Sequence, residues 1–416
     1  MLGLLTRWAQ PRYLAAVCIT MLTAWVVVVA LGWSIQWPND YSAFYFMAKG
    51  LRVFGMGLNH QLYSLRVQYE LEGLGPKSGV GLAIPFVNPP IAAWIMIPFS
   101  FLPLRAAFLL WDAIALIAAG GSLYWLRQTH AEVPGLGIVV LAALASYPTY
   151  IALGQGQYDL LWPLGVALAA SALTVAEAKR WVPRVAVSAL VAAIKPDLLL
   201  GLVVPALSRW RDRRVRVFAL TSVLFGAAVA VILGPTGLSQ AAHVEVFTIA
   251  QRFPPTNDIT VLGFLWALLG AGHHQLASTL ALLAIPVALV LQGALWWRRP
   301  PLSSVDWWLS LTSALCVSLL IAPHDLAQGM VLLTPAALWV GLARRAQGRS
   351  LGPLAWWIVG FNLTTLFDLS PHSLRFPLKV TPLLLLAAAI VAWRARGGSA
   401  TPSIDSTAPV PIVGTP

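Results

Sequence analysis

Long apolar segments recur along this chain of 416 residues and constrain its fold more than any other feature. A helix needs about 20 apolar residues to cross a bilayer, and both Tyr13–Trp33 and Ala106–Leu126 are long enough. Hydrophobic residues make up 58% of the chain and charged residues only 10%, whereas a soluble domain carries roughly 25% charged residues. The sequence therefore predicts an all-α polytopic membrane protein.

Further apolar segments extend this bundle to roughly 10–13 transmembrane or re-entrant helices. Asn88–Phe101 and Val185–Ser208 contain prolines where a break is needed, which predicts re-entrant or half-length pieces. Ile259–Leu269 is too short to span comfortably. The other predicted spans are Leu136–Ala152, Leu160–Val175, Val217–Leu233, Leu276–Leu295, Trp307–Ile321, Met330–Leu342, Leu354–Leu366 and Leu383–Trp393.

Basic clusters separate the apolar segments and predict the orientation, because cytoplasmic loops carry an excess of Lys and Arg. The clusters are Arg7/Arg12, Arg127, Lys179/Arg180/Arg184, Arg209–Arg216, Arg298/Arg299, Arg344/Arg345/Arg349 and Arg394/Arg396. If all of them are cytoplasmic, both termini are inside and residues 34–87 form the first extracytoplasmic loop. We expect one transmembrane domain over residues 1–396. Residues 397–416 are rich in Pro, Ser and Thr, which predicts a disordered cytoplasmic tail.

The positive charge of the chain is explained by this topology. The formal net charge of +12 resides in the clusters between apolar segments, so it does not indicate a nucleic-acid partner. Cys18 and Cys316 both lie inside apolar segments, so neither a disulfide nor a metal site is indicated. The sequence also lacks a Gly-rich phosphate loop, a Ser/His/Asp motif and a zinc-type spacing of His and Cys.

The first extracytoplasmic loop opens with a carboxylate followed by a helical pattern. After Asp40, the residues Tyr41, Phe44, Ala48 and Leu51 share one face of a helix. This spacing predicts an amphipathic helix that lies in the membrane interface with its aromatic face towards the lipid. Asp40 is then either the N-cap of that helix or a catalytic base held at the boundary of water and lipid.

Most of the unusual polar residues fall on the predicted extracytoplasmic face. A transporter would place such groups near the bilayer midplane, often on paired broken helices, so an outward-facing enzymatic site fits better. The residues on this face are Asp40, His60, Gln155, Gln157, Asp159, His243, Glu245, Asn257, Asp258, His324, Asp325, Asp368, His372 and Arg375.

The chemically capable groups each have a structural alternative. A carboxylate near an imidazole can accept a proton from a sugar hydroxyl, yet Pro323-His324-Asp325 also fits a helix stop and restart with Asp325 as the cap. Lys195 is either a lysine snorkelling beside a helix break or an intramembrane partner for an anion. Gly154-Gln155-Gly156-Gln157 is too short for a nucleotide loop and fits a tight turn whose amides line a sugar cavity.

The order of these motifs resembles the membrane-embedded glycosyltransferases of the C-type superfamily that use polyprenyl-phosphate sugars, in particular glycosyltransferase family 87. Asn88 stands where that family usually has Tyr, and Asp197 stands where it has an apolar residue. The resemblance covers roughly residues 33 to 333. The motifs that carry it are Asn39-Asp40-Tyr41, Tyr45–Gly50, Leu62-Tyr63, Asn88-Pro89-Pro90, Ile97-Pro98, Leu102-Pro103-Leu104, Gly154-Gln155-Gly156-Gln157, Ile194-Lys195-Pro196, Asn257 and Pro323-His324-Asp325.

The resemblance implies a specific reaction. Asp40 would be the general base on the acceptor hydroxyl, and polyprenyl phosphate would leave by direct, inverting displacement on the extracytoplasmic side. His324 is the candidate for the second catalytic or phosphate-contacting group. The candidates for binding the donor phosphate or the substrates are Lys195, Arg375, Asn88, Gln155, Gln157, Asn257 and Asp325.

We therefore expect a transfer, in the first place of mannose, from polyprenyl-phosphate-mannose to a glycolipid or glycan acceptor. An arabinofuranosyltransferase of the same fold is the nearest alternative. A flippase or transporter of lipid-linked sugars is the alternative from another class, and a structural scaffold is the third. No cofactor is expected, although Asp40, Asp159 and Asp325 could gather around a divalent cation if the fold brings them together.

Overall fold

The computed structural model confirms an all-α polytopic membrane protein. It describes residues 11–32, 40–73, 85–128, 133, 135–173, 177–196, 202–244, 259–297, 299–302, 304–322, 327–352, 354–355 and 358–359, and within these ranges it contains helices and no strand. Four helices in this part of the chain are long and apolar enough to cross a membrane. They are α2 (Pro11–Ala30), α6 (Leu104–Gln128), α13 (Arg213–His243) and α16 (His274–Trp296).

Shorter helices fill the space between and beside these four. Three of them are α10 (Ala178–Ile194) and α17 (Val305–Ile321), of 17 residues each, and α18 (Thr334–Ala346), of 13 residues. The others are α3 (Asp40–Phe54), α4 (Leu65–Leu71), α5 (Pro90–Met96), α7 (Leu136–Leu144), α8 (Tyr147–Gln155), α9 (Trp162–Ala172), α12 (Val203–Ser208) and α15 (Val261–Leu269). The 3₁₀ turns are η1 (Met56–Gln61), η2 (Pro98–Phe101), η3 (Tyr158–Leu161), η6 (Ala271–His273) and η7 (Ala327–Leu333).

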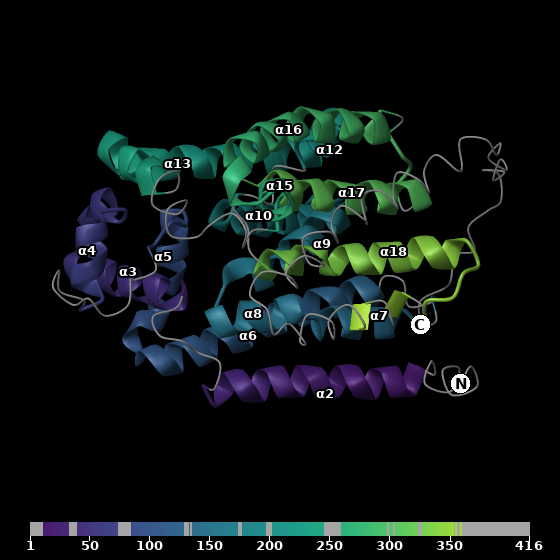
Figure 1. Ribbon diagram of the computed structural model, residues 1–416, viewed down its shortest axis with the longest axis horizontal. Coiled ribbons are helices and arrows are strands. Elements are labelled where there is room, and N and C mark those ends of the chain that lie inside the picture. Colours follow the sequence, from purple (N-terminus) through teal and green to yellow (C-terminus); the bar gives the residue numbers. More distant parts are fainter. Residues whose placement is uncertain are drawn as a thin grey trace.

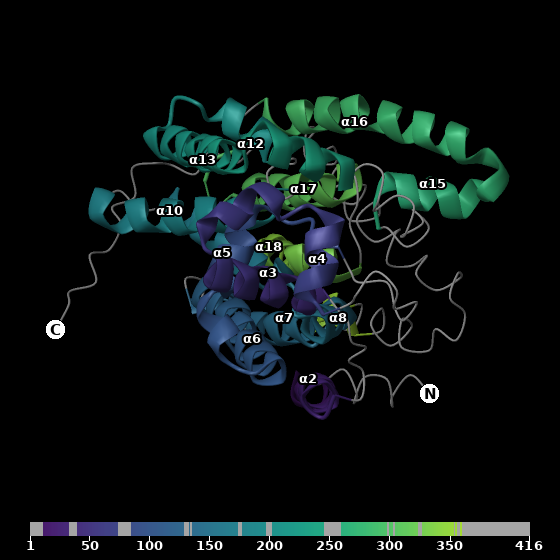
Figure 2. The same ribbon diagram turned by 90° about the vertical axis from the view of Figure 1, so that its left-hand side faces the viewer.

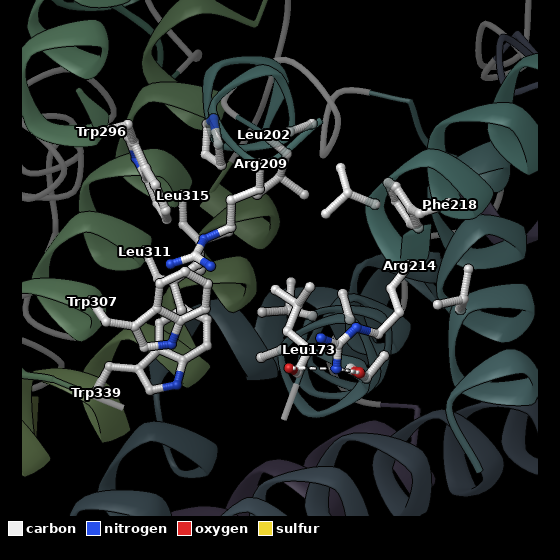
Figure 3. A pocket seen from close by; sticks show the side chains of 18 residues that line it. Leu173, Leu202, Arg209, Arg214, Phe218, Trp296, Trp307, Leu311, Leu315 and Trp339 are labelled. Atoms are coloured by element: carbon white, nitrogen blue, oxygen red, sulfur yellow. Dashed lines mark hydrogen bonds between the residues drawn. The ribbon is translucent and has the colours of Figure 1, made fainter. Parts of the chain in front are cut away.

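The two ends of the bundle differ in kind. Figure 1 shows the long helices side by side, with α3, α4 and α5 gathered at one end, and in Figure 2 these three helices face the viewer. We call this the Asp40 end. The opposite end, which we call the basic end, holds the helix ends that carry the clustered Lys and Arg of the described residues, among them Arg127, Lys179, Arg213 and Arg344. There Arg209 and Arg214 line a crevice between α9, α12, α13 and α17 (Figure 3).

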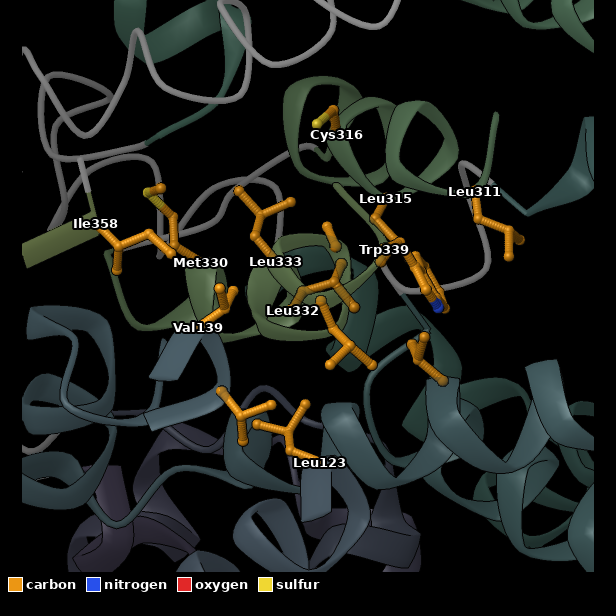
Figure 4. Close-up of a cluster of buried hydrophobic side chains, with 14 of the residues drawn as sticks. Leu123, Val139, Leu311, Leu315, Cys316, Met330, Leu332, Leu333, Trp339 and Ile358 are labelled. Atoms are coloured by element: carbon orange, nitrogen blue, oxygen red, sulfur yellow. The ribbon is translucent and has the colours of Figure 1, made fainter. Parts of the chain in front are cut away.

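The core of the basic half is built around α17. Nearly every side chain of this helix from Trp307 to Leu320 is buried, and Figure 4 shows Leu315 and Cys316 among side chains of α18, η7, α7 and α6. By contrast, in the most apolar 18-residue stretch of α13 only 6% of the residues are buried, and in that of α16 only 17% are buried. α13 and α16 therefore present their apolar side chains to lipid, while α17 is enclosed by protein.

Four of the predicted spans, at Tyr13–Trp33, Ala106–Leu126, Val217–Leu233 and Leu276–Leu295, correspond to helices long enough to cross a membrane. Trp307–Ile321 forms a shorter helix of 17 residues, and Met330–Leu342 begins with η7 and becomes α-helical only at Thr334.

Three further corrections apply. Leu136–Ala152 is not one straight span, because the chain bends by 42° between α7 and α8; Pro148 lies in the first turn of α8, and a proline favours a helix start over a helix interior. In Leu160–Val175 the chain begins with the end of η3, and the α-helix runs over Trp162–Ala172 within the part up to Leu173 that the structure describes. The helix predicted over Val217–Leu233 continues to His243, through a kink at Gly234 where φ is 63° and ψ is 178°.

The interrupted segments behave as predicted. α5 and η2 together give Asn88–Phe101 two short pieces, and α10 ends at Ile194, directly before Lys195-Pro196. The short segment before Leu269 forms the nine-residue helix α15. The tail 397–416, the span predicted at Leu383–Trp393 and most of the span predicted at Leu354–Leu366 lie outside the described residues.

The helix predicted after Asp40 is confirmed as α3, but its environment is not the predicted one. Tyr41, Phe44, Ala48 and Leu51 do share a face, and each is at most 2% exposed, since α4, α5, η1 and η2 pack on this helix. The aromatic face is therefore covered by protein and does not lie against lipid. Periodicity shows that a face is apolar, not what covers it.

Candidate active site

Asp40 is the first described residue of α3 and is half-buried. Its Oδ2 accepts a hydrogen bond from Nε2 of Gln157, a residue 117 positions further along the chain. Gln157 is 7% exposed and stands in the turn between α8 and η3. Two residues that the sequence analysis selected separately are thus in direct contact. A carboxylate at a helix start is also stabilised by the positive end of the helix dipole.

Gly156 fixes this contact because it lets the turn approach α3 closely. Its backbone is in the left-handed region, with φ at 61°. A Cβ atom at this position would lie 2.7 Å from Cβ of Tyr41 and 3.0 Å from the ring of Phe108. The carbonyl oxygen of Gly156 accepts a hydrogen bond of 3.0 Å from Nε1 of Trp111 on α6. Glycine is therefore needed both for the turn and for the fit against Tyr41.

Lys195 lies beside the same turn, paired with Asp159. Its Nζ donates to Oδ1 of Asp159 at 2.7 Å, and it lies 4.7 Å from the ring centroid of Trp162. The Asp159 side chain is fully buried, and that of Lys195 is 16% exposed. From the sequence, Asp159 is predicted only as a polar residue of the extracytoplasmic face and as a candidate cation ligand, not as the partner of Lys195. A signal existed, since a carboxylate in an apolar segment needs a cation and Lys195 interrupts the next apolar helix.

The motifs around α5 are joined to this turn by tyrosine hydroxyl groups. Tyr63 donates to the carbonyl oxygen of Asn88 at 2.8 Å, and Tyr158 donates to that of Ala92 at 2.5 Å. On α3, Tyr45 donates to the carbonyl oxygen of Leu102 at 2.7 Å. These bonds fasten α5 and η2 between α3 and η3. Asn88 is thereby fixed through its backbone at the Asp40 end.

Tyr41 is the neighbour of Asp40 in sequence and is completely buried. Its hydroxyl group finds no hydrogen-bond partner among the described residues. Burial, then the nearby carboxyl group of Asp112 and then Tyr45, raise the pKa of the Tyr41 phenol. The phenol therefore keeps its proton at neutral pH, and Asp40 rather than Tyr41 is suited to accept one.

A polar groove lies at the same end, over the kink of α13. Its cavity measures about 360 Å³. Nδ1 of His60 lies 2.9 Å from the carbonyl oxygen of Leu233, which connects η1 to the kinked helix. Imidazole, amide and hydroxyl groups of this kind form hydrogen bonds with sugar hydroxyls. The groove is lined by His60, Gln61, Ser64, Leu233, Gly234, Pro235, Thr236 and Gln240.

Of the remaining predicted site residues, the structure describes only Gln155. Gln155 is the last residue of α8, half-buried and two positions before Gln157. Among the described residues, no three His, Cys, Asp or Glu side chains gather as they would around a metal ion. Asn257, His324, Asp325 and Arg375 lie outside the described residues.

Fold and site together define an integral membrane protein with a carboxylate, an amide and a buried ion pair at one end of an all-α bundle. Residues 86–323 match the model of glycosyltransferase family 87, and since they make up more than half of the chain, the protein belongs to this family. It is therefore a membrane glycosyltransferase. The matched range includes Gln157, Asp159 and Lys195 and begins after Asp40. No curated protein and no solved structure matches the chain.

Proposed function

We propose that this glycosyltransferase moves mannose from a polyprenyl-phosphate donor to a glycolipid or glycan acceptor, with Asp40 as the general base. The observation that carries the proposal is the half-buried carboxylate of Asp40 held by Gln157 at the start of α3. An oriented carboxylate that takes the proton from an acceptor hydroxyl contributes typically 10²–10⁴-fold to rate. Direct attack of that hydroxyl on the anomeric carbon inverts the configuration and releases polyprenyl phosphate.

In this proposal the leaving phosphate is stabilised by cations. Lys195 stands next to the turn that holds Asp40, although Asp159 already neutralises part of its charge. His324 and Arg375 are the other cationic candidates. Gln155, Gln157, Asn88, Asn257 and Asp325 are the candidates for hydrogen bonds to the sugar. The groove beside His60 is polar enough to receive the hydroxyl groups of an acceptor.

The proposed orientation puts the reaction on the extracytoplasmic side. The clustered Lys and Arg gather at the end of the bundle opposite Asp40, and such clusters are retained in the cytoplasm. Lys49, Arg52, Arg66 and Arg105 lie at the Asp40 end, but they are dispersed over α3, α4 and the start of α6. A site that faces away from the cytoplasm has access to lipid-linked donors and not to nucleotide sugars.

The test is a transfer assay with purified protein in nanodiscs, radiolabelled polyprenyl-phosphate-mannose and a membrane lipid extract as the acceptor pool. We expect wild type to form labelled product and Asp40→Asn to lose at least about 100-fold in rate. Asparagine keeps the shape of the side chain and an oxygen that accepts from Gln157. Asp306→Asn is the matched control, because Asp306 also lies in the first turn of a helix but at the basic end.

Two results would change the proposal. Equal product from wild type and Asp40→Asn would mean that Asp40 only supports the helix. If neither protein forms product, the same assay with a polyprenyl-phosphate-arabinofuranose donor distinguishes the two sugars. Failure with both donors would mean that the enzyme transfers neither mannose nor arabinofuranose from such a donor.

A further inference from the structure

The basic end contains a second cavity that the transfer reaction does not use. It measures about 100 Å³, is partly open, and lies between α9, α10, α12, α13, α16, α17 and α18. Three tryptophans, Trp296, Trp307 and Trp339, form one side of it, and Phe218 lies across from them (Figure 3). Apart from two arginines, Arg209 and Arg214, its walls are apolar.

Arg209 enters this crevice with an incomplete set of partners. Nη2 donates to the carbonyl oxygen of Pro300 at 2.5 Å, and the guanidinium carbon lies 4.7 Å from the ring centroid of Trp307. Nε is buried and has no hydrogen-bond partner in the described part of the chain. Burial lowers the pKa of Arg209 most, with Arg299 and Arg214 adding to the effect and Asp212 opposing it. A guanidinium group stays charged in proteins, so an anion bound beside Arg209 would stabilise its buried positive charge.

Arg214, the second arginine of the crevice, uses its hydrogen-bond donors within the protein. Its Nε and Nη2 donate to the two carboxylate oxygens of Asp212 at 3.0 and 3.1 Å. Its Nη1 donates to the carbonyl oxygen of Leu173 at 2.7 Å, which ties the start of α13 to the end of α9. Arg214 thus closes the helix ends, and Arg209 is the arginine suited to bind a ligand.

The depth of the crevice in the membrane follows from two exposed tryptophans beside it. Trp210 follows Arg209 and is 51% exposed, and Trp297 follows the buried Trp296 and is 85% exposed. Tryptophan is enriched where a membrane meets water. The crevice is also bordered by α13 and α16, whose apolar side chains face outward. It therefore lies at the level of lipid headgroups, beside the lipid-facing surface.

A ligand that satisfies both parts of this cavity carries an anionic group and hydrocarbon together. The volume is several times the roughly 10–15 Å³ that one water needs, and an apolar cavity of this kind does not hold water well. Arg213, Arg216 and Arg299 add positive charge around it, and basic pockets between transmembrane helices bind acidic headgroups. We propose that the crevice binds one anionic phospholipid, with its phosphate on Arg209 and part of one acyl chain against Trp307 and Leu311.

The test measures thermal unfolding of the full-length, delipidated protein in detergent with four additions. These are phosphatidylglycerol, phosphatidylcholine with the same chains, polyprenyl phosphate and inorganic phosphate. A ligand that binds the folded state raises Tm in proportion to its occupancy. We expect phosphatidylglycerol to reach half of its effect at a concentration at least about tenfold below that of phosphatidylcholine, and inorganic phosphate to have no effect. An equal effect of phosphatidylcholine or of inorganic phosphate would overturn the proposal. Polyprenyl phosphate is expected to act at the Asp40 end, so an effect of it that Arg209→Gln abolishes would overturn the proposal as well.

Variants assign the effect to the crevice. Arg209→Gln should weaken the response to phosphatidylglycerol at least about tenfold, whereas Arg211→Gln removes the same charge from an exposed side chain and should keep the response. Equal responses of the two variants would overturn the assignment. If Arg209→Gln does not fold, Ala170→Leu replaces it, because this change keeps every charge and fills part of the cavity. It loses the response if the lipid binds in the crevice and keeps it if the lipid binds elsewhere.

Discussion

The Asp40 end and the basic end differ in how completely their charged side chains are paired and in how their helices are divided. At the Asp40 end, charged side chains meet polar or charged side chains, as Asp40 meets Gln157 and Lys195 meets Asp159. At the basic end, Arg214 also meets a carboxylate, that of Asp212, but Arg209 reaches the backbone carbonyl oxygen of Pro300 and the ring of Trp307. One end therefore orients groups that can react, and the other closes helix ends and receives lipid.

The two ends also differ in the regularity of their backbone. The helices at the Asp40 end are short and interrupted, with α4 and α5 of seven residues each and 3₁₀ turns beside them. Irregular backbone within a membrane protein is tolerated only where protein or water covers it, and here tyrosine hydroxyls and Gln68 satisfy its polar groups. Gln68, for example, bonds Leu62 and Phe86 through both ends of its amide. Interrupted helices thus accompany the site, although the six-residue helix α12 shows that the basic end has a short helix as well.

The largest effect that separates the two ends is expected at the Lys195–Asp159 pair. Lys195→Met leaves a fully buried carboxylate without its cation, and breaking a buried pair costs about 3–5 kcal/mol. The double variant Lys195→Met/Asp159→Leu removes both charges and should recover most of that stability. Thermal unfolding in detergent measures both.

Transfer activity of the double variant then distinguishes two roles of Lys195. If Lys195 contacts the donor phosphate, as proposed, the double variant folds and remains at least about tenfold slower than wild type. Recovery of transfer together with stability would show that Lys195 serves only as the partner of Asp159.

A smaller but still local effect is expected from Gly156→Ala. The added Cβ would collide with Tyr41 and hold a non-glycine residue at positive φ, for a combined cost of about 2–4 kcal/mol. Because the turn would move away from α3, Gln157 would lose Asp40, so transfer should fall by more than the loss of folded protein explains. Gly121→Ala on α6, where a Cβ meets nothing within 4 Å, is the control. Wild-type activity of Gly156→Ala would show that the Asp40–Gln157 contact is dispensable.

Sequence patterns predicted the features of this fold that depend on neighbouring residues. The helix after Asp40, the long spans and the break at Lys195-Pro196 follow from periodicity, span length and proline. The bend at Ser146 was missed, although Ser146-Tyr147-Pro148 offered a residue suited to a helix N-cap and a proline suited to a first turn.

The contacts of the site depend on residues far apart in the sequence. Asp40 and Gln157 are 117 positions apart, and Asp159 and Lys195 are 36 apart. Each of these polar residues stands out in an apolar chain. Which of them form pairs is decided by the packing of the turn at η3 against α3 and the end of α10. The sequence could thus propose Asp40, Gln157 and Lys195 as site residues, and it could not identify Asp159 as the partner of Lys195.

The smallest predicted effect concerns Glu72. Like Arg209 at the basic end, this side chain has buried polar atoms that lack a hydrogen-bond partner among the described residues. Both of its carboxylate oxygens are buried without a hydrogen-bond partner in the described part of the chain. Burial raises the pKa of Glu72 to about 7 in the folded protein. The unfolded chain releases this proton at lower pH, so stability from Glu72 is complete at acidic pH, declines as pH rises towards 7 and stays reduced above it.

Glu72→Gln should remove this dependence and stabilise the protein at pH 8 by about 1–2 kcal/mol, allowing for partial exposure, with little change at pH 4.5. Thermal unfolding at the two pH values checks the prediction. Glu70→Gln is the control, because Glu70 is 56% exposed and paired with Arg66 at 2.9 Å. If wild type and Glu72→Gln differ in stability by the same amount at both pH values, Glu72 ionises normally. The Asp40 end would then lack a buried charged group comparable to Arg209.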